Sequence, residues 1–191
     1  MIYLVRHGDT EYSPTRRLAG KSDIALTAAG EANAVKLGAR LAPIAFDRVW
    51  VSPLQRARRT AELAGFAERA VVEPRLREID FGDLEGKTWA ELRATNAAWN
   101  YWDYVAPNGE SALDVGRRAD DLLVDLNSLT GTTLIFAHSV VIRVLTARYL
   151  GLPPTAGRML SITPGSISIL EHDPIDAANA ILAWNDRGHL G

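Results

Sequence analysis

Thr133-Leu134-Ile135-Phe136-Ala137 is the clearest central strand in the sequence, because only its first residue is polar. The strand ends at His138, and the apolar pattern beyond it predicts a helix that ends at Leu150-Gly151, where the glycine favours a helix terminus. A strand that passes directly into a helix is typical of a parallel sheet covered by helices. This stretch therefore favours an α/β fold.

The first third of the chain repeats this alternation. Ile2–Val5 is a short apolar run that predicts a buried strand, and a helix is expected over Thr27–Leu41 with its first residue as the N-cap. Arg48–Val51 predicts a second strand. Ser52-Pro53 then indicates a helix start, with serine as the N-cap and proline at the first helical position, and this helix is expected to end near Gly65.

Local signals predict the remaining elements. They are a short strand at Val71-Val72, a charged loop over Leu76–Gly86, capping boxes at Thr88–Glu91 and Ser111–Asp114, a turn at Asn108-Gly109, and late strands at Ile167–Leu170 and Ala180–Trp184. The sequence shows no internal repeat and no linker. We therefore predict one domain over residues 1–191, built as a three-layer α/β/α sandwich with a mostly parallel central sheet.

Composition narrows the range of partners. The 21 basic and 23 acidic residues nearly cancel, so we expect neither nucleic acid nor an acidic membrane as a partner, and a small phosphorylated substrate fits better. Cysteine is absent, which excludes disulfides and thiolate chemistry. The N-terminus lacks the basic start and long apolar run of a signal peptide, so a cytoplasmic location is expected. An exposed late strand could pair in a homodimer.

Groups that can bind phosphate follow three of the predicted strands. They occur in Arg6-His7, in Ser52–Arg56 and in His138-Ser139. In open α/β sheets, ligands bind at the carboxyl ends of the strands, so these segments should meet at one site. The helix predicted after His138 should direct its N-terminal amides toward the same place and add partial positive charge.

A phosphate ester needs fixed positive donors and a nucleophile. Arg6 and Arg56 can supply the positive charge, and His138 can donate a further hydrogen bond. Neutral imidazole is the strongest available nucleophile, because cysteine is absent, and either His7 or His138 could serve. Gly8 allows close approach of the backbone to a ligand, which favours His7 modestly.

Four motifs together resemble the histidine phosphatase superfamily, also called the phosphoglycerate mutase-like family. They are Leu4–Thr10, Ser52–Ala57, Leu76–Gly82 with Glu85-Gly86, and His138 before an apolar helix. The resemblance spans nearly the whole chain and implies the phosphoglycerate mutase-like fold. It also implies a helical insertion at about residues 83–110 that covers the active site.

The resemblance further implies roles for individual residues. His7 would become a phosphohistidine, Glu78 would protonate the leaving oxygen and then activate water, and Arg6, Arg56 and His138 would clamp the phosphoryl group. No metal and no other cofactor is expected. Phosphate or substrate binding is also predicted for Thr10, Ser13, Gly20 and Ser139.

Two positions depart from the family pattern. Ser139 stands where glycine is expected, and its side chain could narrow the pocket or contribute a hydroxyl while its backbone N–H still donates. Ser13 stands where many relatives have asparagine. The aromatic cluster of the insertion either contacts the organic part of the substrate or packs the insertion onto the domain; its members are Trp99, Tyr101, Trp102 and Tyr104.

The predicted reaction is hydrolysis of a phosphomonoester, and two alternatives stay open. A phosphoglycerate mutase would return the phosphoryl group from the same phosphohistidine to a second hydroxyl. A binding module of the same fold would hold phosphate without turnover. Hydrolysis is favoured because the chain lacks the longer insertions and tail usual in the mutases, and because it retains every expected catalytic residue.

Overall fold

The computed structural model describes residues 1–173 and 175–191, and the strands within these residues form one sheet. The strands are β1 (Ile2–Arg6), β2 (Arg48–Val51), β3 (Ala70–Val72), β4 (Thr133–Ala137), β5 (Ile167–Asp173) and β6 (Ala178–Asp186). Their order across the sheet is β3-β2-β4-β1-β5-β6. The neighbours among β3, β2, β4 and β1 are parallel, whereas β5 is antiparallel to β1 and to β6, so the sheet is mostly parallel as predicted.

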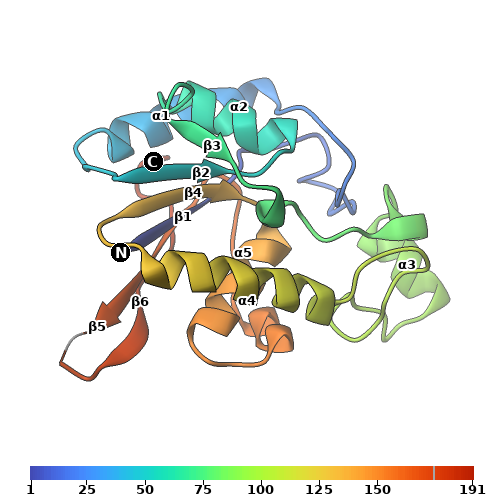
Figure 1. Cartoon of the computed structure of the whole chain (residues 1–191). Helices are drawn as coiled ribbons and strands as arrows, with labels where there is room; N and C mark the ends of the chain where they lie inside the picture. Colours follow the sequence, from blue (N-terminus) through green and yellow to red (C-terminus); the bar gives the residue numbers. More distant parts are fainter. Residues whose placement is uncertain (174) are drawn as a thin grey trace.

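Helices cover both faces of this sheet (Figure 1). α1 (Ala28–Leu41) and α2 (Gln55–Leu63) lie on one face, and α4 (Ala112–Ser128) and α5 (Ser139–Tyr149) lie on the other. A separate apolar cluster fills each interface: Leu37 and Phe136 belong to the first, and Leu122 and Ile142 to the second. The expected three-layer α/β/α sandwich is therefore confirmed.

Strand register decides which loops meet. Arg6 pairs with Ala137 at the last position of the β1–β4 ladder, and Val51 pairs with Phe136 in the β2–β4 ladder. Backbone bonds continue beyond these pairs, since the amide of His7 donates to the carbonyl of Ala137 at 3.0 Å. The segments that follow β1, β2 and β4 consequently start side by side at one edge of the sheet.

Three predicted helix starts are confirmed. Thr27 caps α1 by accepting a hydrogen bond from the amide of Gly30, and complete capping boxes at Thr88 and Ser111 start α3 (Trp89–Thr95) and α4. These signals are local in sequence, so a strand or a distant loop has little influence on them.

The predicted start of α2 is wrong. Its N-cap is Leu54, and the helix begins at Gln55 instead of at Pro53. The amide of Gln55 donates to the carboxylate of Asp23 at 2.7 Å, so the acceptor for the first turn of α2 comes from another loop. The hydroxyl of Ser52 instead lies 2.6 Å from Nε2 of His138. The Ser52 side chain, which local capping rules predict to cap the helix, therefore contacts a residue that is distant in sequence.

The irregular segments are more ordered than their sequence indicates. The loop around Glu78 contains two short 3-10 turns, η1 (Pro74–Leu76) and η2 (Gly82–Leu84), and a third, η3 (Pro154–Met159), follows α5. The late strands are longer than predicted and form the antiparallel pair β5–β6. β6 lies at a sheet edge, where the predicted pairing into a homodimer stays a prediction.

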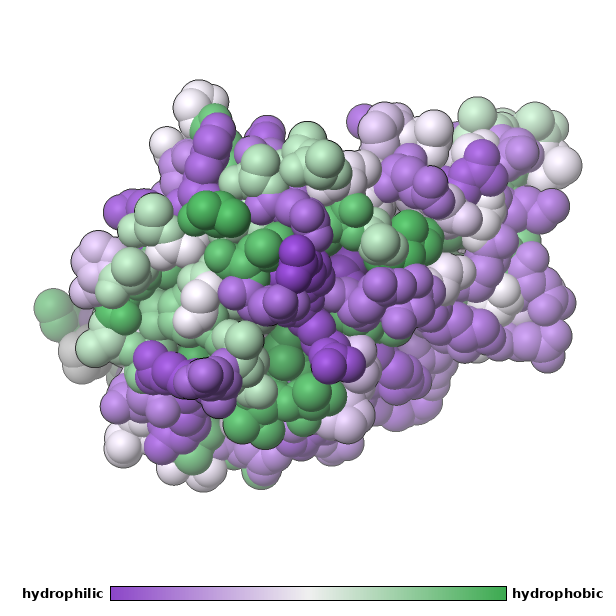
Figure 2. All heavy atoms as spheres, turned by 90° about the horizontal axis from the view of Figure 1, so that it is seen from above, coloured by the Kyte–Doolittle hydropathy of each residue, from purple (hydrophilic) through white to green (hydrophobic). Residues whose placement is uncertain are grey.

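The outer face over α1 and α2 has mixed character. Figure 2 shows hydrophobic and hydrophilic side chains interspersed over the side that Figure 1 has at the top. Arg59 of α2 forms ion pairs there with Glu31 of α1 and with Glu62. Among the described helices, none is both long enough and apolar enough to cross a membrane.

Candidate active site

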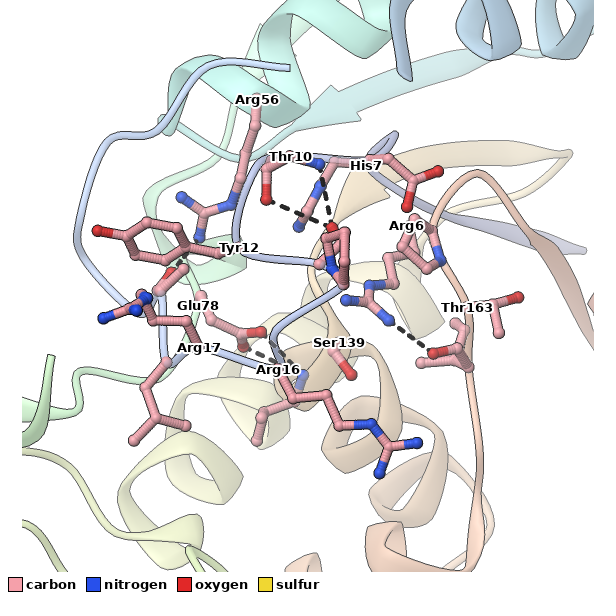
Figure 3. Close-up of a pocket in the computed structure, with 18 of the residues that line it drawn as sticks. Arg6, His7, Thr10, Tyr12, Arg16, Arg17, Arg56, Glu78, Ser139 and Thr163 are labelled. Carbon is pink, nitrogen blue, oxygen red and sulfur yellow. Dashed lines mark hydrogen bonds between the residues drawn. The ribbon is translucent and has the colours of Figure 1, made fainter. Parts of the chain in front are cut away.

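A cavity of about 560 Å³ lies at the carboxyl ends of β1 and β4. Arg6, His7, Arg56, Glu78 and Ser139 all line it. Figure 3 shows His7 between Arg6 and Arg56, with Glu78 and Ser139 on another side of the same space. The strand ends identified from the sequence therefore meet in one pocket, as the topology of an open α/β sheet requires.

His7 has one free ring nitrogen. Its Nδ1 lies 2.7 Å from the carbonyl oxygen of Gly8, and a carbonyl can only accept, so Nδ1 carries the proton and donates. The lone pair of the neutral ring is consequently on Nε2. The side chain is 6% exposed. Burial, followed by the positive charges of Arg56 and Arg6, holds the pKa of His7 well below its usual value of 6.5. The imidazole is therefore a neutral base at neutral pH.

The two guanidinium groups are held by backbone carbonyls. Arg6 donates to the carbonyl of Ile162 at 2.7 Å, and Arg56 donates to those of Ser22, Ala19 and Gly20 at 2.7, 2.7 and 2.9 Å. Burial lowers the pKa of each group, and the carboxylate of Glu78 acts in the opposite direction on both. Nε of each arginine has no partner among the described residues. The pocket therefore contains fixed positive charge that carbonyls orient without neutralising.

His138 is buried beside His7. The ring centroids are 5.1 Å apart, and Nε2 of His138 lies 2.6 Å from the hydroxyl of Ser52. That hydroxyl also accepts from the amide of Leu54 at 3.3 Å and can donate its own proton to Nε2, an arrangement that puts the ring proton on Nδ1. Nδ1 is buried without a partner in the part of the chain that the structure describes. Burial, then the charge of Arg56, keeps the pKa of His138 well below 6.5, so the ring is neutral and can donate from Nδ1.

Glu78 occupies the N-terminus of α5. Its Oε1 accepts from the amides of Ile79, Val140 and Val141 at 3.0, 3.1 and 3.1 Å, and its Oε2 accepts from Val140 at 3.0 Å. The N-terminus of α5 does reach the predicted site, since Ser139 and Val140 line the pocket, but the amides of Val140 and Val141 donate to Glu78. The helix terminus instead orients the carboxylate, because a buried carboxylate requires donors of this kind.

A third arginine, also buried, holds the loop that carries Glu78. Arg118 of α4 donates to the carbonyls of Arg75 and Arg77 at 2.7 Å each, and its Nη2 lies 3.3 Å from the carboxylate of Glu110. Glu110 also accepts from the amide of Asp80 at 3.0 Å. The residues before and after Glu78 are thus fixed from one side, and the amides of α5 fix its side chain from the other.

The residues predicted to assist binding separate into two groups. Thr10, Ser13 and Ser139 line the pocket, and the Ser13 hydroxyl accepts from the amide of Thr10 at 3.0 Å. Gly20 does not line the pocket. A Cβ at Gly20 would lie 2.1 Å from the carbonyl oxygen of Ile79, and the Gly20 carbonyl accepts from Arg56. Gly20 therefore supports Arg56 and does not reach the phosphate space itself.

Gly8 was expected to allow the backbone to approach a ligand closely, but in the structure it allows a close approach to the backbone of Gly30. A Cβ at Gly8 would lie 2.8 Å from the carbonyl oxygen of Gly30, and a Cβ at Gly30 would lie 2.3 Å from that of Asp9. The amide of Gly8 donates to the hydroxyl of Thr60 at 3.0 Å. The glycines allow the loop after β1 to pack against the first turn of α1, which positions His7 from behind.

The aromatic cluster is divided between the pocket and the core, and its fourth member, Tyr104, is exposed. Tyr101 lines the pocket together with Trp89 and Phe81. Trp99 and Trp102 are buried in the core cluster around α4 and α5, at 7% and 9% exposure. Figure 1 shows α3, which begins at Trp89, to one side of the sheet. Part of this segment therefore borders the pocket and part packs it onto the domain.

Sequence reasoning missed three of the residues that build this site. Ser52 was assigned to a helix cap, Arg118 lies in the interior of a helix, and Arg143 lies on α5 five residues after His138. The one signal available for Arg118 and Arg143 was a charged residue within an otherwise apolar helix face. Within the described ranges, no group of three His, Cys, Asp or Glu side chains could hold a metal ion.

The sequence matches a known superfamily over residues 2–187, namely the histidine phosphatase superfamily (branch 1). It is 36% identical over 181 residues to the "Probable phosphoglycerate mutase GpmB" of Erwinia tasmaniensis, a match that covers 90% of this chain and 84% of that protein.

Solved structures agree with this match. The product of open reading frame Rv3214 from Mycobacterium tuberculosis superposes with a TM-score of 0.90 at 28% identity, covering 96% of each chain. The alpha-ribazole phosphatase from Shigella flexneri has a TM-score of 0.83 at 28% identity, covering 97% of this chain and 96% of its own. Given the motifs in one pocket and a match over nearly the whole chain, this protein belongs to the histidine phosphatase superfamily.

Proposed function

We propose that the protein hydrolyses phosphomonoesters through a phosphohistidine on His7. The observation that carries the proposal is the 2.7 Å hydrogen bond from Nδ1 of His7 to the carbonyl of Gly8. This bond leaves the Nε2 lone pair free for attack, and burial beside Arg6 and Arg56 keeps the ring neutral. The same two guanidinium groups would bind the non-bridging oxygens of the phosphoryl group.

In the first step, the Nε2 lone pair of His7 attacks phosphorus and the ester P–O bond breaks. The departing oxygen takes a proton from Glu78 in its acid form. Oε1 of Glu78 accepts from three backbone amides, whereas Oε2 accepts from one, so we assign the transferred proton to Oε2. Nδ1 of His138 would donate to a phosphoryl oxygen as negative charge develops there.

In the second step, Glu78 is a carboxylate and takes a proton from a water molecule as the water oxygen attacks phosphorus. The P–N bond breaks, its electron pair returns to Nε2 of His7, and inorganic phosphate leaves. The proton taken from water restores the acid form of Glu78, so one carboxyl group serves both steps.

Transfer to a second hydroxyl is the competing function. The relative from Erwinia tasmaniensis carries the name of a phosphoglycerate mutase, and a mutase would share the first step and replace the attacking water by an alcohol. Hydrolysis is supported by the likeness to a phosphatase from Shigella flexneri over nearly the whole of each chain. The third possibility, a phosphate-binding module without turnover, is disfavoured because four catalytic candidates line one pocket and the fifth, His138, is buried directly beside His7; the four are Arg6, His7, Arg56 and Glu78.

The test measures phosphate release from p-nitrophenyl phosphate and from a panel of metabolite phosphomonoesters, across acid to neutral pH, with isomerisation of 3-phosphoglycerate followed in parallel. We expect hydrolysis by the wild type and a loss of about 10³-fold or more in His7→Ala. His172→Ala is the matched control, because His172 is exposed on β5 and does not line the pocket. Isomerisation faster than hydrolysis would favour the mutase, and release from none of the esters would favour the silent module.

A further inference from the structure

Glu85-Gly86 is a part of the sequence motifs that the proposed mechanism does not use. The two residues follow η2, and neither lines the pocket. The backbone here runs beside the loop after β1, since the amide of Gly86 donates to the carbonyl of Leu18 at 2.8 Å and the amide of Leu18 donates to the carbonyl of Lys87 at 2.9 Å. The start of the insertion is therefore attached to the loop whose carbonyls bind Arg56.

The carboxylate of Glu85 accepts four hydrogen bonds. Its Oε1 accepts from the amides of Lys21 and Phe81 at 3.0 and 3.1 Å, and its Oε2 accepts from the amide and the hydroxyl of Ser22 at 3.3 and 2.5 Å. All four donors belong to neutral groups. A carboxylate can only accept, so its two oxygens suit four such donors. Glu85 therefore joins residues 21 and 22 of one loop to residue 81 of another.

A single peptide unit connects Glu85 to Arg56. The N–H of Lys21 donates to Glu85, and the carbonyl of Gly20, which belongs to the same peptide, accepts from Nη2 of Arg56 at 2.9 Å. The N–H and C=O of a trans peptide point in opposite directions within one plane, so the carboxylate and the guanidinium lie at opposite edges of that plane. Both charges polarise the peptide in the same sense, which strengthens both bonds. The orientation of this peptide consequently depends on both side chains.

The direction of the Arg56 guanidinium depends in turn on this loop. Its Nη2 donates to the carbonyls of Ala19 and Gly20, and its Nη1 donates to that of Ser22, while Nε has no partner among the described residues. A guanidinium is planar and has five N–H groups, so three bonds to one loop determine where the others point. Burial lowers the pKa of Arg56, and Glu85 is one of three carboxylates that act in the opposite direction. Glu85 thus acts on Arg56 through the loop and by its charge.

Glu85 also contacts the loop that carries Glu78. Phe81, whose amide donates to Glu85, lies three residues after Glu78. A Cβ at Gly20 would lie 2.3 Å from Oε1 of Glu85 and 2.1 Å from the carbonyl oxygen of Ile79, so three segments meet where there is no room for a side chain. The loop that holds the phosphate-binding arginine is therefore packed at Glu85 against the loop of the proposed general acid.

We propose that Glu85 is a positioning residue that sets the orientation of the Arg56 guanidinium through the Gly20–Lys21 peptide. This inference rests on the proposed binding of the phosphoryl group by Arg56. A carboxylate is needed at this position, because a glutamine amide would direct its NH2 group at a backbone N–H in either orientation of the side chain.

The test measures binding of inorganic phosphate by isothermal titration calorimetry, beside kcat/KM for p-nitrophenyl phosphate and propyl phosphate. Glu85→Gln should weaken phosphate binding and lower kcat/KM by about 10-fold or more, with the same factor for both esters because they share the phosphoryl group. Glu85→Asp keeps the acceptor and should recover part of the loss. Ser22→Ala removes one of the four donors and should produce a smaller loss in the same direction.

A double-mutant cycle shows whether Glu85 acts through Arg56. Lysine cannot reproduce the planar donor set that binds three carbonyls, so in an Arg56→Lys background Glu85→Gln should change phosphate binding and kcat/KM by less than about 2-fold. Thermal unfolding of each variant reports the stability of the fold separately.

Asp114→Asn is the matched control. Oδ2 of Asp114 accepts from the amide and the hydroxyl of Ser111 at 2.9 and 2.6 Å, the same pair of donors that Ser22 offers to Glu85, but neither Asp114 nor Ser111 lines the pocket. This substitution should lower the melting temperature and leave phosphate binding and kcat/KM unchanged.

The outcomes separate this inference from the proposed function. Equal losses from Glu85→Gln in the wild type and in Arg56→Lys would refute it, and so would a lower melting temperature with unchanged phosphate binding. If phosphate binds and the cycle is non-additive but no ester is hydrolysed, the proposed function fails and the inference stands. If the wild type does not bind phosphate, the inference fails with the role of Arg56. If Glu85→Gln does not fold, Ser22→Ala is carried through the same cycle with the same criteria.

Discussion

The hydroxyl of Ser52 lies 2.6 Å from Nε2 of His138, although 86 positions separate the two residues in the chain. Each side chain directly follows a strand, and β2 and β4 are neighbours in the sheet, so the contact is a direct consequence of strand order. Ser52 is thereby the hydrogen-bond partner of Nε2, whereas Nδ1 is buried without a partner among the described residues.

Ser52→Ala removes the only partner of Nε2 among the described residues. We expect the free energy of unfolding to fall by about 1–3 kcal/mol, because a buried ring nitrogen is left without a hydrogen bond. We also expect kcat to fall about 10-fold, because the tautomer of His138 is no longer fixed. Urea unfolding and steady-state kinetics measure the two effects. Ser168→Ala, a fully buried serine that bonds Asn185 on the neighbouring strand, should lose stability and keep kcat.

Acid should destabilise the fold through the two buried histidines. The pKa values of His7 and His138 lie well below 6.5 in the folded protein, mainly because of burial, and return to about 6.5 on unfolding. The unfolded chain therefore binds more protons below that pH, and stability present above pH 6.5 is lost as the pH falls from there toward the folded pKa values. Each histidine should contribute up to about 1.4 kcal/mol per pH unit.

Urea unfolding between pH 7.5 and pH 5 checks this expectation. His138→Gln should reduce the slope of stability against pH relative to the wild type, whereas the exposed His172→Gln should not. An unchanged slope in His138→Gln would show that His138 is not held in its neutral form.

Glu78→Gln separates the two catalytic steps. The amide retains the shape of the side chain but can neither give nor take a proton, so we expect kcat to fall by about 10²–10⁴-fold. The alkoxide of an alkyl phosphate needs a proton from an acid in order to leave, so the first step should slow most for alkyl esters. p-Nitrophenolate leaves without one, so p-nitrophenyl phosphate should give a burst equal to the enzyme concentration, with phosphohistidine detected by intact-protein mass spectrometry.

The surface carboxylate variant Glu62→Gln provides the comparison and should behave as the wild type, since Glu62 pairs with Arg59 away from the pocket lining. Equal losses for alkyl and aryl esters in Glu78→Gln, with no burst, would count against an acid role for Glu78.

Gly8→Ala should displace the nucleophile through the backbone. The new Cβ would lie 2.8 Å from the carbonyl oxygen of Gly30, which is main chain and cannot rotate away. We expect a loss of about 1–3 kcal/mol in the free energy of unfolding together with reduced kcat. Gly188→Ala serves as the control, because its Cβ would meet only the side-chain oxygen Oδ1 of Asp186, at 3.3 Å. Wild-type stability and activity in Gly8→Ala would refute the close-packing explanation.

Local patterns were sufficient for most of the fold. The alternation of apolar strands with capped helices predicted a mostly parallel α/β sandwich, and Thr27, Thr88 and Ser111 started their helices as expected. Since parallel strands direct their carboxyl ends to one edge, the sequence positions of Arg6-His7 and His138 were enough to predict that they meet. The family resemblance added Glu78, which no periodicity could have selected from a charged loop.

The sequence by itself therefore determined the layers, the strand ends and the residues that gather there, because each depends on patterns within one turn or one strand. Only the tertiary structure decided what those residues contact: Ser52 holds His138 instead of a helix start, Glu78 takes the amides of α5, and Gly8 packs on Gly30. The physical reason is that buried polar groups must find partners, and several partners close together in space are far apart in the chain.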